Sequence, residues 1–108
     1  MTIDSMPVDV ATEAGTLLKL LGEPLRWEII RRLAAEDLCT CHLVADLDAA
    51  QPLVSHHLRV LRQARLVTTD RVGAFTYYAL DRAALAQLAD VLGELAAEPA
   101  GQRRRPCT

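Results

Sequence analysis

Two cysteines separated by a single residue, Cys39 and Cys41, are the first candidates for chemistry in this chain. Thiolates select soft ions, so a pair at this spacing could hold one metal or metalloid ion. The pair could also be small apolar filler in a core, or a redox switch. Residues i and i+2 project about 200° apart on an α-helix and share a face on extended backbone. We therefore expect the two sulfurs to meet on one ion only if the backbone at Thr40 departs from regular helix.

The sequence leaves the third donor for such an ion open. Cys107 is the only other cysteine, and it could reach the pair within its own subunit or across a dimer. His42 could bind zinc or cadmium, and an external thiol could also complete the set. An enzyme that pairs Cys41 with His42 is not expected, because neighbours in sequence point apart on a helix.

Bulk properties restrict the class of protein. The 108 residues are 51% hydrophobic and 24% charged, which is typical of one globular domain. The sequence shows neither a signal peptide nor an apolar run long enough to cross a membrane, so we expect a cytoplasmic protein. Because the cytosol keeps thiols reduced and the number of cysteines is odd, a structural disulfide is not expected.

Helices are the main elements that must position these residues. Apolar residues three and four positions apart predict amphipathic helices. With Asp9 as an N-cap and Pro24 as a helix start, the expected ranges are 9–21, 24–33, 37–47, 51–64 and 82–97. The last helix carries an apolar stripe that is too broad for a monomer, so we expect it to form a dimer interface with the first helix.

A helix-turn-helix and a β-hairpin follow one another in the middle of the chain. A short turn separates the third and fourth helices, as in DNA-binding helix-turn-helix proteins. The β-branched run 66–71 and the aromatic run 75–80 flank Gly73, which predicts a hairpin. The predicted fold is therefore mainly α with a small β-hairpin, a winged helix-turn-helix. This DNA-binding domain is expected to span residues 1–98, with a flexible basic tail over 99–108.

The fourth helix and the hairpin carry the candidate contacts to DNA. Residues 50–82 hold five arginines against two aspartates, on a chain whose formal net charge is −2. A basic segment on an acidic molecule points to a polyanionic partner. The start of a recognition helix reaches base edges, while arginines bind guanine or phosphate. The candidate DNA-binding residues are Gln51, Ser55, His56, Arg59, Arg62 and Arg71. We expect Trp27 and His57 to pack inside the protein, and Leu53 and Val54 to lie in the core or in a contact between helices.

Four segments in this order resemble the ArsR/SmtB family of metalloregulatory repressors. They are 20-LLGEPLRWEIIRRL-33, 38-LCTCHL-43, 51-QPLVSHHLRVLRQARLV-67 and 76-TYYAL-80. The second segment is similar to the family's arsenic-sensing box, in which a Cys-x-Cys pair precedes the recognition helix. The resemblance implies a homodimer that binds operator DNA, an inverted repeat, and leaves it when a soft ion binds. It also implies As(III) or Sb(III) as the effector, with three sulfurs that would here be Cys39, Cys41 and Cys107.

Three positions depart from the family pattern. Val44 stands where arsenic-box members often carry a third cysteine, and the last helix has no histidine for the family's zinc site. Ala50 replaces the usual serine before the recognition helix, so we expect Asp48 to provide the cap. A sensor of cadmium, lead or zinc, or a thiol redox sensor on the same scaffold, therefore stays open as an alternative.

The position of the cysteine pair suggests how an ion would act on DNA binding. If both cysteines lie in a helix, ligation must pull the first turn of that helix out of shape. The recognition helix follows after a short turn, so ion binding and DNA binding would compete for one stretch of backbone. A coupling of about 1–3 kcal/mol per site would change the affinity up to about 150-fold.

Replacement of Arg59 by alanine should weaken operator binding by about 1–3 kcal/mol if this side chain contacts a base. The equilibrium affinity is measured by fluorescence anisotropy at several salt concentrations. An unchanged affinity together with an unchanged salt slope would remove Arg59 from the DNA contacts.

Overall fold

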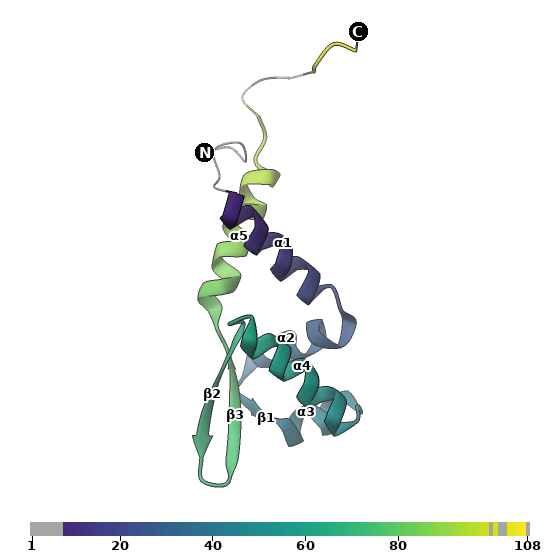
Figure 1. Cartoon of the computed structure of the whole chain (residues 1–108), viewed down its shortest axis with the longest axis vertical. Helices are drawn as coiled ribbons and strands as arrows, with labels where there is room; N and C mark the ends of the chain where they lie inside the picture. The colour runs from purple at the N-terminus through teal and green to yellow at the C-terminus, as the bar shows by residue number, and fades with distance from the viewer. Residues whose placement is uncertain (1–7, 100, 102–103, 108) are drawn as a thin grey trace.

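The computed structural model describes residues 8–99, 101 and 104–107, with the backbone alone for residues 8–12. Within this part, helices α1 and α5 lie at one end of the molecule, and the remaining elements form a winged helix at the other end (Figure 1). The predicted fold class is thus confirmed. The elements in chain order are α1 (Val8–Leu21), α2 (Pro24–Ala35), β1 (Leu38–Cys39), α3 (Thr40–Leu47), α4 (Gln51–Gln63), β2 (Val67–Val72), β3 (Phe75–Leu80) and α5 (Arg82–Ala96).

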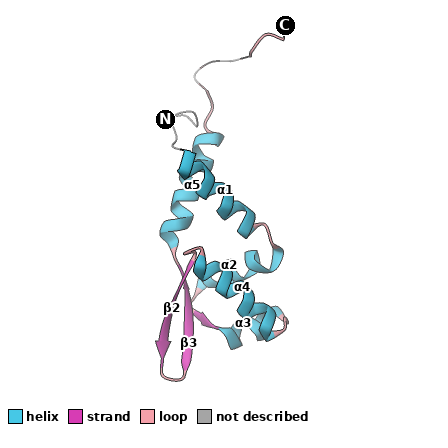
Figure 2. Ribbon diagram, viewed as in Figure 1, coloured by secondary structure: helices cyan, strands magenta, loops and turns pink. Residues whose placement is uncertain are grey.

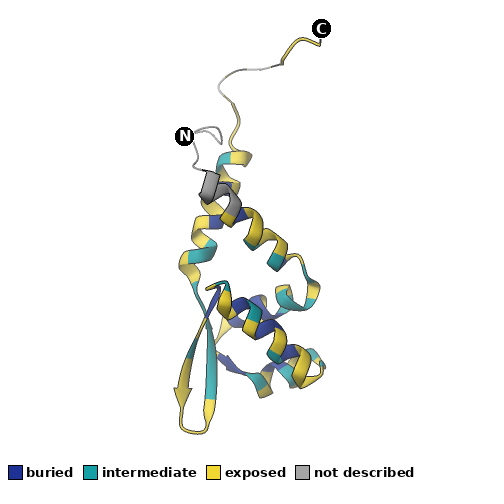
Figure 3. Ribbon diagram, viewed as in Figure 1, coloured by how far each residue is buried: buried dark blue, intermediate teal, exposed yellow. Residues whose placement is uncertain are grey.

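The core lies where α2, α3 and α4 meet the base of the sheet. Helix α4 buries Val54, His57, Leu58 and Leu61, which recur at three- and four-residue spacing and form one stripe. Buried side chains of α2, α3 and the start of β2 face this stripe (Figure 3). Burial of this apolar surface is the main force that holds α4 on the domain.

Local backbone chemistry fixes the helix ends. Glu23 caps α2, because its carboxylate accepts a hydrogen bond from the backbone N–H of Arg26 at 2.9 Å, and Pro24 occupies the first turn. Asp48 ends α3 in the left-handed conformation with φ 49°. Helix α4 begins after Ala50 without a side-chain cap, so the expected cap from Asp48 is wrong.

The sheet contains a strand that the sequence did not predict. The strand order is β1-β3-β2, and all pairs are antiparallel (Figure 2). Strand β1 lies inside the range 37–47 that was predicted to be helical. The predicted wing is present as β2 and β3, with Val72 paired to Phe75 across a turn in which Gly73 has φ 62°. Glycine adopts this conformation at little steric cost.

Several predicted positions differ in the structure. Trp27 is 48% exposed, so the expectation that it packs inside is wrong, and Leu53 is 46% exposed and therefore does not belong to the core. The faces of α2 and α4 that pack inward are already filled by other apolar side chains. Helix α1 begins at Val8, so Asp9 lies in its first turn rather than at its N-cap. Within the described part of the chain, no helix combines the length and apolar character needed to cross a bilayer.

Arg65 connects α4 to the wing in a strained conformation. Its φ is 62°, a region in which a side chain costs about 1 kcal/mol relative to glycine. The backbone N–H of Leu66 donates to the carbonyl of Leu61 at 3.0 Å, and that of Arg65 donates to Arg62 at 3.0 Å. These two bonds form a Schellman motif, whose left-handed position is usually glycine.

Replacement of Arg65 by glycine should therefore raise the free energy of unfolding by about 0.5–1 kcal/mol. Urea denaturation followed by circular dichroism measures this difference. Arg62→Gly is the matched control, because Arg62 lies in the last turn of the helix, and it should destabilise the protein. A destabilised Arg65→Gly protein would show that the left-handed conformation carries no cost at this position.

Candidate metal centre and nucleic-acid interface

The change from strand to helix brings the sulfurs of Cys39 and Cys41 together. Cys39 is extended, with φ −88° and ψ 168°, and ends β1, whereas Cys41 lies in the first turn of α3. The backbone around Thr40 thus departs from regular helix, as ion binding by both sulfurs was expected to require. The two sulfurs are joined as a disulfide, with Cα atoms 5.5 Å apart. The expectation that these cysteines carry no disulfide is therefore wrong. It rested on the reducing cytosol and the odd number of cysteines, and neither shows whether two sulfurs that a change from strand to helix brings together are linked.

His42 completes a group of three donors at this junction. Its Nδ1 accepts a hydrogen bond from the backbone N–H of Cys39 at 3.1 Å and lies 3.3 Å from the sulfur of the same residue. The potential ligand atoms of Cys39, Cys41 and His42 all lie within 4.8 Å of one another. Cys39 is buried, whereas Cys41 and His42 are exposed, so solvent reaches the group from one side.

The three donors fit a soft ion once the cysteines are reduced. An ion about 2.3 Å from each of two sulfurs holds these sulfurs about 4 Å apart. The disulfide must therefore open before both cysteines can bind one ion, and the oxidised and ion-bound forms exclude each other. Cys107 is exposed and does not join the group within this subunit, so its role as a ligand stays a prediction.

The same junction contacts the wing. Cys39 pairs with Tyr77 of β3, and Leu38 pairs with Tyr78. The rings of His42 and Tyr77 lie 6.2 Å apart, whereas Tyr78 packs against the core from the opposite face of the strand. The cysteine pair is therefore attached directly to the wing as well as to α3. Sequence analysis missed this connection, because a two-residue strand has too little alternation to be recognised.

The candidate DNA contacts lie on the outer face of α4 and on the wing. Gln51, Ser55, Arg59 and Arg62 are spaced by four, four and three residues, which places them on one stripe of the helix. Ser55 is half-buried, and the other predicted contacts, including His56 and Arg71, are exposed. Helix α4 thus presents a polar stripe to solvent, beside the stripe that packs in the core.

A buried histidine joins α4 to the start of α2, and sequence analysis predicted its burial without its partners. His57 is only 6% exposed. The Nε of Arg26 donates to Nδ1 of His57 at 3.0 Å, and Oε2 of Glu23 lies 3.6 Å from Nε2 of the same ring. Nothing in the sequence indicated that His57 contacts a residue 31 positions away.

Both titratable partners in this cluster have pKa values below their ordinary range. Burial lowers the pKa of His57 from 6.5, with smaller contributions from Arg26 and His56 and an opposing one from Glu23. The hydrogen bond from the backbone N–H of Arg26 lowers the pKa of Glu23 from 4.5. The cluster is thus built for a neutral imidazole beside an ionised carboxylate.

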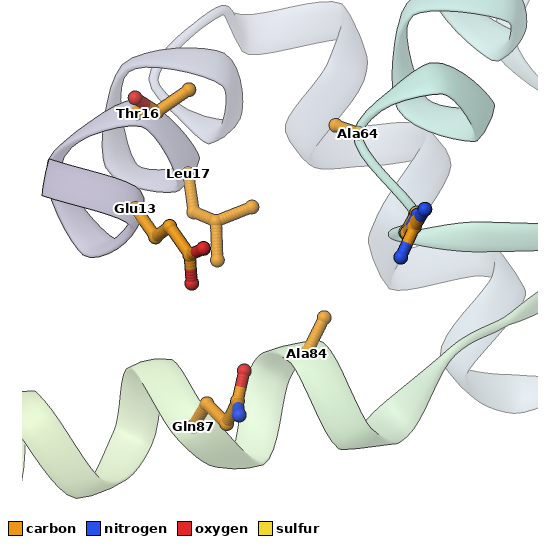
Figure 4. A pocket seen from close by; sticks show the side chains of 7 residues that line it. Glu13, Thr16, Leu17, Ala64, Ala84 and Gln87 are labelled. Atoms are coloured by element: carbon orange, nitrogen blue, oxygen red, sulfur yellow. The ribbon is translucent and has the colours of Figure 1, made fainter. Parts of the chain in front are cut away.

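A pocket of about 430 Å³ lies between α1, α5 and the end of α4 (Figure 4). Leu17, Ala64 and Ala84 supply apolar walls, and Glu13, Arg65 and Gln87 supply polar groups. The pocket lies at the junction of the two terminal helices with the winged helix.

Comparisons with known proteins place the chain in a family. Residues 23–69 match the model of the bacterial regulatory proteins of the arsR family. The chain is 38% identical over 73 residues to an arsenical resistance operon repressor of Staphylococcus aureus, covering 68% of this chain and 70% of the relative. It is 39% identical over 75 residues to a transcriptional repressor SmtB homolog of Synechocystis sp., covering 69% of this chain but only 57% of the relative.

A solved structure agrees with this assignment. An ArsR-like transcriptional regulator from Rhodococcus sp. superimposes with a TM-score of 0.75 at 26% sequence identity, covering 82% of this chain and 84% of that one. The matched family segment contains α2, β1, α3, α4 and the start of β2, and so includes the cysteine pair and the recognition helix. The chain therefore belongs to the arsR family of bacterial regulatory proteins.

Proposed function

We propose that this protein is a transcriptional repressor that binds operator DNA as a homodimer and leaves it when a soft ion binds at Cys39 and Cys41. The observation that carries the proposal is the convergence of two sulfurs and an imidazole between the wing and α3. Thiolates at this junction select soft ions, and the N-terminus of α3 favours the thiolate form. The family consists of regulators, so no catalytic role is assigned to these side chains.

As(III) or Sb(III) is the proposed effector. The Staphylococcus aureus relative is named as a repressor of an arsenical resistance operon, and it is similar to this chain over the segment that holds the cysteine pair. Trivalent arsenic takes three sulfurs in this family, and Cys107 or an external thiol would supply the third. If His42 is the third donor instead, the set suits divalent zinc or cadmium better, because imidazole binds these ions well.

Ion binding would act on DNA binding through two connections. Helix α3 leads through Asp48 to α4, and β1 is hydrogen-bonded to β3 of the wing. Because Cys39 is already extended, the sulfurs can share an ion without unwinding α3. The expected distortion of the helix is therefore not needed. Ion binding would instead shift β1, and this shift would move the wing and α4 relative to each other.

The dimer would form through α1 and α5, which pack against each other at the end opposite the wing (Figure 1). Leu18 of α1 and Leu92 and Leu95 of α5 are large apolar side chains that remain exposed in the single chain. Their burial against a second copy would remove this apolar surface from water. A two-fold dimer would place two recognition helices on an inverted repeat, with half-sites about one helical turn or a multiple of it apart.

A thiol redox sensor is the second candidate function. The disulfide between Cys39 and Cys41 supports it, because oxidation needs no partner from the C-terminal tail. Both functions use the same sulfurs, but they differ in the form of the protein that leaves DNA. The repressor of the first proposal binds DNA when reduced and ion-free, whereas a redox sensor would leave DNA when the disulfide forms.

The two functions are separated by titrating a protein–DNA complex. The probe is a DNA duplex selected by the reduced protein from a random pool, and binding is followed by gel shift with As(III), Cd(II), Zn(II) or a thiol oxidant. As(III) should lower the affinity of the reduced protein by up to about 150-fold per site. Release by oxidant but not by any ion would favour the redox sensor and reject the proposed effector.

Variants identify the donors in the same assay. Cys39→Ser and Cys41→Ser proteins should bind the duplex and fail to respond to As(III). Cys107→Ser and His42→Asn distinguish the third donor, because only the variant that lacks it should lose sensitivity. A Cys41→Ser protein that still leaves DNA on addition of As(III) would contradict the proposed site.

A further inference from the structure

The contacts of His57 couple the recognition helix to the first turn of α2. Arg26 and Glu23 both belong to the start of α2, and His57 lies in the middle of α4 on its buried face. Glu23 uses the same oxygen, Oε2, to cap α2 and to approach the imidazole. These three residues, the Glu23–Arg26–His57 cluster, therefore form a polar contact between α2 and α4.

The protonation state of His57 follows from its partners. The Nε of Arg26 can only donate a hydrogen bond, so Nδ1 of His57 must accept it at 3.0 Å. A neutral ring then carries its hydrogen on Nε2, which points to the carboxylate of Glu23 at 3.6 Å. Protonation of Nδ1 would turn this atom into a donor on a cationic ring, and it would then face the Nε donor of the cationic Arg26 side chain. The bond from Arg26 must then break, while the attraction to Glu23 increases.

We propose that the Glu23–Arg26–His57 cluster sets the position of the recognition helix on α2, and that protonation of His57 shifts this helix and weakens operator binding. The inference rests on the proposed binding of operator DNA and is independent of the ion at the cysteine pair. His57 acts here as a positioning residue, because it is buried, whereas the predicted DNA contacts of α4 are exposed or half-buried.

Burial and the charged groups around His57 together determine how readily the ring is protonated. From α2, Glu23 attracts the imidazolium and Arg26 repels it, and from α4 itself His56 repels it. Burial is the largest effect and lowers the pKa of His57 below 6.5. Its contribution to folded stability is therefore complete above about pH 6.5 and is lost as the pH falls toward the lower folded-state pKa. The pKa of Glu23 lies below 4.5, so its carboxylate stays ionised in mild acid.

The test compares wild-type protein with His57→Asn and His57→Leu at pH 7.5 and pH 5.5, using the selected DNA duplex. Asparagine keeps an acceptor near the position of Nδ1 but does not titrate, whereas leucine removes the acceptor and leaves Arg26 without its partner. At pH 7.5, His57→Leu should bind about tenfold more weakly than wild type, which corresponds to one lost hydrogen bond to a charged group, and His57→Asn should recover most of that loss.

The pH profile separates positioning from simple packing. Between pH 7.5 and 5.5, the affinity of wild type should fall about tenfold relative to that of His57→Asn. His56 is present in both proteins, so any direct effect of His56 on DNA binding cancels in this ratio. Parallel profiles of wild type and His57→Asn would overturn the proposal, and urea denaturation of each variant at pH 7.5 verifies that it is folded.

Hydrogen exchange tests the cluster without DNA. After correction for intrinsic rates, the α4 amides of wild type should exchange several-fold faster at pH 5.5 than at pH 7.5, and those of His57→Asn should not. Exchange that responds to pH in a protein that selects no duplex would support the cluster and reject the proposed repressor. Duplex binding with α4 exchange that is insensitive to pH would retain the repressor and reject the cluster.

Discussion

The pairing of β1 with β3 is the constraint on which the candidate site depends. Two residues of extended backbone, Leu38 and Cys39, are hydrogen-bonded to the wing, and the helix can begin only after them. This break places one cysteine on the strand and the other in the first helical turn, so their sulfurs meet. The same pairing makes the candidate site part of the sheet that carries the wing, so the proposed ion site is adjacent to the proposed DNA-binding elements.

A second set of contacts holds the recognition helix from the other side. The apolar stripe of α4 gives it a place in the core, but apolar burial is not directional. The hydrogen bond from Arg26 to His57 is directional, and it defines how far and at what angle α4 lies on α2. Helix α4 is thus held by α3 at its beginning and by α2 at its middle, and a change in either contact can change its position.

Periodicity made most of this fold predictable from sequence. The apolar spacing of α4 and the alternation around Gly73 are strong signals, and the helix-turn-helix with its wing follows from their order. Strand β1 was missed because two residues have no period, and its partner Tyr77 lies 38 positions away. The exposure of Trp27 was missed because a single bulky residue does not reveal which side of a helix has room left. The cysteines could be identified as a pair from their spacing. Their junction with the wing could not be identified, because it depends on the two-residue strand β1.

The sheet order also decides which backbone groups the wing leaves open. Strand β2 lies at one edge of the sheet, so the polar groups along its outer side have no neighbouring strand within the described chain. Such an edge can recruit another strand and start aggregation. Asp70 and Arg71 are exposed charged residues on this edge strand. Charged side chains on an edge strand disfavour pairing with a strand of another molecule. The wing can therefore stay long enough to reach a duplex while resisting edge-to-edge association in a crowded cell.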